Sequence, residues 1–114
     1  MGTNNHSDTN LLAKVADIAA LVDYQSGAVV SRTIIERNSG TVTLFAFDQG
    51  QGLSEHTAPF DALVHIIDGT AVIIIEGRTY VLKNGEAIIM PANHTHALRA
   101  DTRFKMMLVM IREN

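Results

Sequence analysis

Histidine is the residue type in this sequence that is best suited to chemistry, and its histidines are clustered. Four of the five, His56, His65, His94 and His96, lie between positions 56 and 96. Imidazole is the commonest protein ligand of transition metals, and its ordinary pKa lets it exchange a proton near neutral pH. The sequence has no cysteine, so thiolate metal ligands, disulfides and cysteine nucleophiles are excluded. The chemistry indicated is a metal site on imidazole nitrogens, or a free pair of imidazoles that acts as a base or hydrogen-bonds a ligand.

The spacing of His94 and His96 decides how many imidazoles could meet. On an extended strand, residues two apart point to the same face, which makes His94 a candidate third ligand beside His96 and His56. His94 also follows Pro91-Ala92-Asn93, a loop pattern, and within a loop it would point to solvent. Both placements are open from the sequence.

Two further patterns indicate no separate chemistry. Ser54 and His56 could share a face, but no orienting carboxylate for a hydrolase triad is evident. Four methionines, Met90, Met106, Met107 and Met110, are interpreted as core filling rather than as a soft-metal site.

Short strands must position the histidines. Apolar and β-branched runs bounded by turn residues predict strands at 29–36, 41–47, 63–67, 71–75, 79–83, 86–90, 96–100 and 104–112. Glu76-Gly77-Arg78 predicts a hairpin between two of them. Strands and turns at this spacing are typical of an all-β sandwich or barrel.

The N-terminal quarter of the chain has a different pattern. Residues 1–8 are polar and are predicted to form a flexible tail. Residues 9–27 place apolar side chains at steps of three and four, which predicts a short N-terminal helix, or else a strap across a sheet. Residues 28–114 are predicted to form the barrel.

Composition excludes several functional classes. The chain of 114 residues and 12.4 kDa is 46% hydrophobic, which fits one globular domain. Nine basic residues against twelve acidic ones give a net charge of −3, so no general nucleic-acid-binding face is expected. No stretch approaches the length of a membrane span and no secretion signal is visible, so we expect a cytoplasmic protein without a membrane partner.

Several predicted strands are apolar on both faces. The runs 63–67, 71–75 and 104–111 are examples. A sandwich strand with one face in water should alternate between apolar and polar residues. Something must therefore cover the second face, and the sequence predicts a homodimer in which a second subunit does so.

One sequence motif resembles the first motif of the cupin family, which is Gly, five residues, His-x-His, three or four residues, Glu, six residues, Gly. Gly50, His56 and Gly69 stand at matching positions. Ala58 stands where the family has its second histidine, and Ala62 where it has its glutamate.

A second motif matches the family pattern of Gly, five residues, Pro-x-Gly, two residues, His, three residues, Asn. Gly85, Pro91 and His96 match, whereas Asn93 replaces the glycine and Ala100 the asparagine. The resemblance covers about residues 41–111 and implies a double-stranded β-helix, a jelly-roll-like barrel. It carries over only His56 and His96 as metal ligands.

Two nearby residues are weaker ligand candidates. His65 lies three residues after Ala62, and this odd spacing turns it to the opposite face, toward the sheet surface or a dimer contact. Asp61 could reach the pocket only if a bulge near Pro59 swung it inward.

The resemblance implies a site inside the barrel. We expect a small organic molecule in an apolar pocket, bound at a divalent metal (Zn, Ni, Fe or Mn) that His56 and His96 hold, with His94 as third ligand or proton carrier. Dioxygenase, oxalate-degrading and isomerase activities are implied by resemblance alone, and the alanines at 58 and 62 depart from the ligand set of that chemistry. The alternative is a metal-free ligand-binding or sensory module without turnover. A third interpretation is a structural dimer with no site.

Overall fold

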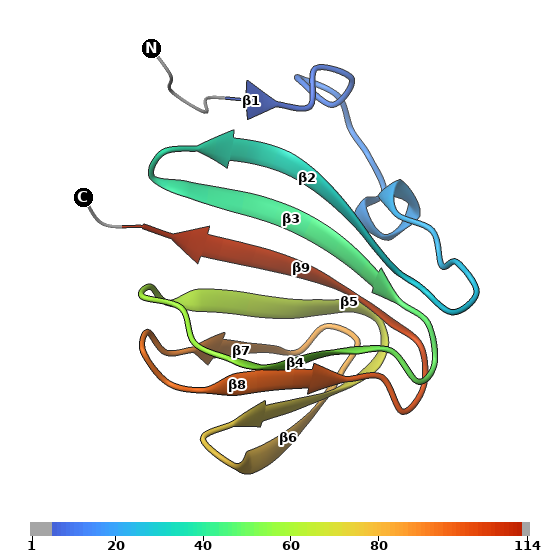
Figure 1. Cartoon of the computed structure of the whole chain (residues 1–114). Helices are drawn as coiled ribbons and strands as arrows, with labels where there is room; N and C mark the ends of the chain where they lie inside the picture. The colour runs from blue at the N-terminus through green and yellow to red at the C-terminus, as the bar shows by residue number, and fades with distance from the viewer. Residues whose placement is uncertain (1–5, 113–114) are drawn as a thin grey trace.

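Strands make up most of residues 6–112, which this computed structural model describes (Figure 1). The elements in chain order are β1 (His6–Ser7), the 3-10 helix η1 (Ile18–Leu21), β2 (Val29–Arg37), β3 (Gly40–Phe47), β4 (Gly52–His56), β5 (Ala62–Ile75), β6 (Arg78–Lys83), β7 (Ala87–Met90), β8 (His96–Arg99) and β9 (Phe104–Ile111). All strand pairs are antiparallel. The predicted all-β fold is confirmed.

The long strand β5 joins two facing layers (Figure 1). Its first half pairs with β9 and β7, and its second half, from Thr70 on, pairs with β6 and β8. Between the halves the register shifts near Asp68, and Gly69 has a φ of +76°. The sequence predicted two separate strands, 63–67 and 71–75, with Asp68-Gly69 closing the first. The structure instead bends one strand there, because glycine adopts a positive φ without steric cost.

The core lies between the two layers. In the first part of β5 and at the start of β9, buried residues alternate with less buried ones, as the period of two in a strand requires. The buried members of the cluster are Phe47, Ala62, Val64, Ile66, Ala71, Ile73, Ile75, Leu82, Met90, Leu98, Ala100, Phe104 and Met106. Phe47 and Phe104, from adjacent strands, stack with ring centroids 4.6 Å apart. Strands β4 and β8, which carry His56 and His96, pair with each other in one of the two layers.

The N-terminal helix predicted within residues 9–27 is wrong in extent: the segment is a strap whose only helical part is η1. Side chains of the sheet bind the backbone oxygens of the strap, as Arg32 donates to Leu21 O at 3.1 Å and Lys105 donates to Ala19 O at 2.6 Å. Val22 is buried against Leu44 and Ala46 of β3. These tertiary hydrogen bonds replace those of an α-helix, which is costly to nucleate in so short a segment.

The predicted tail over residues 1–8 falls partly outside the described residues, and His6–Ser7 pair with β2 as β1. Within residues 6–112, no helix is both long and apolar enough to cross a membrane. The cytoplasmic location stays a prediction.

Candidate functional site

His56 and His96 meet at one side of the barrel, although 40 positions separate them. His56 ends β4 and His96 begins β8, and the two residues are directly paired in the sheet. Their Nε2 atoms lie 3.1 Å apart, with the ring planes at 72°. Directly paired residues of neighbouring strands face the same side, so the sheet register itself aims both rings at one point.

The other nitrogen of each ring is held by a backbone carbonyl. His56 Nδ1 lies 2.7 Å from Ser54 O, and His96 Nδ1 lies 3.3 Å from His94 O. A carbonyl oxygen can only accept a hydrogen bond, so a proton on each Nδ1 fits these two contacts. With both protons on Nδ1, both Nε2 atoms present lone pairs to one ion. Without an ion, the 3.1 Å contact between them is a hydrogen bond that needs a proton on one of the two Nε2 atoms.

Burial keeps His96 neutral. His96 is 5% exposed. Its pKa is lowered, first by the loss of hydration and then by the neighbouring His56, against a smaller opposing effect of its hydrogen bond to the His94 backbone. A neutral imidazole is the form that binds metal ions. Burial of His96 thus favours the form of this ring that binds a metal ion.

The two rings open into a small cavity of about 60 Å³. The ten residues that line it are Leu53, His56, Ala58, Ala62, Met90, His96, Leu98, Met106, Leu108 and Met110. Eight of them are apolar, and no lining residue is acidic. Since one water needs about 10–15 Å³ in such a measure, the cavity has space for about four to six water-sized groups.

The separation of the Nε2 atoms fits a shared ion. Two nitrogens 3.1 Å apart, each about 2.0–2.1 Å from one ion, subtend an angle of about 100° at that ion. This angle lies between octahedral and tetrahedral values. A metal ion bound there would also leave its remaining positions open toward the apolar cavity.

The other histidines lie elsewhere. His94, the candidate third ligand, has a half-exposed side chain, and its Nδ1 is 3.8 Å from Glu76 Oε1. His65 pairs with Met107 and Ala87 and does not line the cavity. Within residues 6–112, no three His, Cys, Asp or Glu side chains come together as a metal site.

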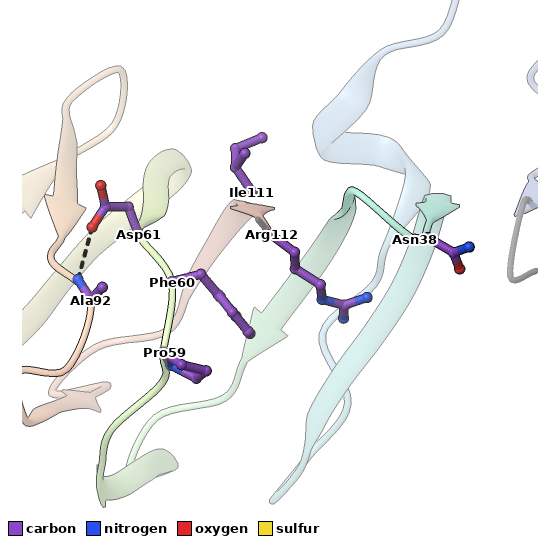
Figure 2. A pocket seen from close by; sticks show the side chains of 7 residues that line it. All are labelled: Asn38, Pro59, Phe60, Asp61, Ala92, Ile111 and Arg112. Atoms are coloured by element: carbon purple, nitrogen blue, oxygen red, sulfur yellow. Dashed lines mark hydrogen bonds between the residues drawn. The ribbon is translucent and has the colours of Figure 1, made fainter. Parts of the chain in front are cut away.

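A larger hollow of about 480 Å³ is lined in part by the β4–β5 connection (Figure 2). It is lined by Asn38, Pro59, Phe60, Asp61, Ala92, Ile111 and Arg112. Figure 2 shows the Asp61 carboxylate directed to the Ala92 backbone, where Oδ1 accepts a hydrogen bond of 2.8 Å. Asp61 therefore binds a loop here and does not line the histidine cavity. No histidine lines this hollow, so the smaller cavity is the candidate site.

Sequence reasoning underestimated the methionines of the site. Met90, Met106 and Met110 line the cavity, whereas Met107 faces the strap on the outer side. The signal was present in the strand 104–112, since Met106, Leu108 and Met110 are two apart and Met107 falls between them. These residues are core filling and cavity lining at once.

Comparisons with known proteins agree with this architecture. A family model described as "Cupin domain" matches residues 43–112. A conserved protein of unknown function from Streptococcus pyogenes is similar, with 37% identity, a TM-score of 0.86, and coverage of 98% of this chain and 95% of that one. A cupin superfamily protein from Desulfitobacterium hafniense is 26% identical with a TM-score of 0.84, covering 89% of this chain and 93% of that one. No match is found among curated proteins.

A more distant similarity shows the fold alone. Salicylate 1,2-dioxygenase from Pseudoaminobacter salicylatoxidans, in a structure with gentisate adducts, is 12% identical with a TM-score of 0.69. The similarity covers 75% of this chain and 25% of that one.

Proposed function

The chain belongs to the cupin domain family, and from that premise we propose that it binds a small ligand inside the barrel at a metal centre formed by His56 and His96. The observation that carries this proposal is the arrangement of the two Nε2 atoms, 3.1 Å apart with both Nδ1 atoms turned to carbonyls. Metal-binding histidines are generally held in this way, with the second ring nitrogen donating to a fixed acceptor. A cation that accepts both Nε2 lone pairs would be held by the two rings together.

The residues of the cavity fit only part of the family's ligand set. His56 and His96 supply two ligands, while Ala58 and Ala62 stand at the other two motif positions and both line the cavity. Within residues 6–112, no carboxylate lines this cavity, so the centre fits an ion that binds imidazole nitrogen and needs few protein ligands. The ion, when bound, polarises a ligand atom as a Lewis acid. The apolar lining, which includes Leu53 and Leu98, keeps bulk water away.

The size of the cavity limits the ligand. Pockets for drug-sized molecules are about 300–1,000 Å³, against about 60 Å³ here. This supports a ligand of a few heavy atoms.

A metal-free ligand-binding module without turnover is the second candidate. The feature that favours it is the apolar lining with two fixed imidazoles, which can hydrogen-bond a small hydrophobic or carboxylate ligand. Metal titration separates the two candidates.

The test uses chain purified without an affinity tag and titrated separately with Zn²⁺, Ni²⁺ and Cu(I) under calorimetry. We expect at least one of these ions to bind at one per chain, and His56→Ala or His96→Ala to remove that binding. His65→Ala and His94→Ala are the matched controls and keep it. Absence of binding by all three ions, or binding that survives both alanine substitutions in the pair, would exclude the metal centre.

We also propose that the chain is a homodimer through the outer face of the β7-β5-β9-β3-β2 layer. A row of aliphatic side chains crosses these strands in direct register: Ile35, Val42, Val109, Leu63 and Ile89. Ile35 is 41% and Ile89 is 61% exposed. The strap covers the neighbouring part of this face, at Leu44, Ile67 and Met107, and leaves the row uncovered.

A second copy of this chain is the occupant that the row fits. With strands about 4.8 Å apart, five strands make the row about 19 Å long between its ends. The row has no charged side chain, so a two-fold axis can place it against itself without opposing like charges. Such self-complementarity supports a second subunit over a charged partner.

A further inference from the structure

Three thioether groups share the cavity with the two imidazoles. Met90 comes from β7, and Met106 and Met110 come from β9. Met90 is 4% and Met106 is 1% exposed, so these sulfur atoms are shielded from solvent. The chain has no cysteine, so methionine is its only source of sulfur ligands.

The sheet register places two methionines around the position that the family gives to its glutamate. Ala62 pairs with Met90 on one side and with Met110 on the other. Directly paired residues point to the same face, and all three line the cavity. The carboxylate of the family motif is thus replaced by a methyl group between two thioethers.

This exchange changes which ion the cavity favours. A divalent cation held by two neutral imidazoles in an apolar lining has no compensating negative charge, and burial of uncompensated charge is costly. A monovalent ion has a much smaller desolvation cost, because that cost rises with the square of the charge. Thioether sulfur is a soft ligand that selects Cu(I), and imidazole also binds copper.

We propose that the cavity is a Cu(I) site in which the Nε2 atoms of His56 and His96 and thioether sulfur from Met90, Met106 and Met110 hold the ion. This proposal rests on the metal centre proposed above and specifies which ion it binds. Cu(I) needs neither the glutamate of the family motif nor a full octahedral shell. With alanine at positions 58 and 62 and thioethers beside them, the cavity is expected to prefer a soft ion.

Competition with bicinchoninate in anaerobic solution measures the Cu(I) affinity. The variants Met90→Leu, Met106→Leu and Met110→Leu, singly and combined, remove sulfur at nearly constant volume. The matched control is Met107→Leu, since Met107 lies on the same strand but faces outward. We expect the combined variant to lose at least about tenfold in Cu(I) affinity, with Zn²⁺ affinity unchanged and the control equal to the parent chain.

X-ray absorption at the copper edge gives an independent readout on the unaltered chain, and it holds even if the combined variant fails to fold. We expect nitrogen and sulfur scatterers in the first shell of bound Cu(I). A shell of nitrogen or oxygen alone would overturn the proposal.

The outcomes separate this inference from the metal centre itself. Zn²⁺ or Ni²⁺ binding that depends on His56 and His96, with Cu(I) affinity unaffected by loss of the three methionines, would overturn the Cu(I) site and leave the centre standing. Failure of every ion to bind at the histidine pair would remove both.

Discussion

Single side chains fasten the strap to the barrel, and Tyr24 is the clearest case. Its hydroxyl donates to Asp68 Oδ2 at 2.5 Å, and the Arg103 guanidinium and Lys105 Nζ lie 4.3 and 5.0 Å from the centroid of its ring. Burial, followed by the Asp68 carboxylate, raises the pKa of Tyr24 well above its usual value of 10.0. The folded chain therefore retains a proton that the unfolded chain loses above about pH 10.

This difference predicts a loss of stability in alkali. The contribution of Tyr24 is complete below pH 10 and declines as the pH rises above it, by at most about 1.4 kcal/mol per pH unit for one proton. Tyr24→Phe should remove that slope and cost about 1 kcal/mol at pH 7. Urea unfolding of both chains from pH 8 to 11 measures the difference. Parallel curves over this range would contradict the role of Tyr24.

At the same scale, part of the site could be predicted from the sequence. The motif spacing identified His56 and His96, because a sheet register that pairs them is a consequence of the fold. The placement of His94 could not be predicted, since it depends on whether the strand begins before or after residue 94, and β8 begins at His96. The contribution of Met90 depends on its pairing with Ala62, which only the three-dimensional register reveals.

Among the elements, β5 does most to position the site, because its bend places the two layers face to face. A Cβ on Gly69 would lie 2.4 Å from Arg103 O, whereas one on Gly77, with a similar φ of +78°, has nothing within 4 Å. Gly77→Ala should then cost only the left-handed strain, about 1–2 kcal/mol. Gly69→Ala adds overpacking and should cost about 2–5 kcal/mol in total. Chemical denaturation compares the two, and equal losses would show that the close approach at Gly69 is unimportant.

Element types were more predictable than their connections. Alternation and turn residues predicted β2, β3, β6 and β7 within a few residues, since these patterns are local. The segment 52–56, which ends at His56, was not predicted as a strand. It forms β4 with mostly exposed side chains and so lacks an apolar signal. The prediction of a helix over the strap was wrong in extent because the strap is held by hydrogen bonds from Arg32 and Lys105. These residues are distant in the sequence, so a local pattern does not reveal them.

For the whole molecule, the aliphatic row predicts the oligomeric state. Light scattering after gel filtration at micromolar concentration should give a mass twice the 12.4 kDa of the chain. Ile89→Asp places a charge in the row and should yield monomer. Val81→Asp is the matched control, because Val81 is 60% exposed, close to the 61% of Ile89, but lies on β6 in the other layer. A monomeric parent chain, or a dimer that survives Ile89→Asp, would refute the proposed interface.

The most direct test of the central claim is the nitrogen NMR spectrum of the histidine rings at pH 7.5, recorded before and after addition of one equivalent of Zn²⁺ and, separately, of Cu(I). The arrangement at Ser54 O and His94 O predicts that, with an ion bound, His56 and His96 both carry their proton on Nδ1. One of the ions should then shift the Nε2 signals of these two rings together and leave His65 unchanged. A proton on Nε2 of both rings, or Nε2 signals that neither ion moves, would contradict the account.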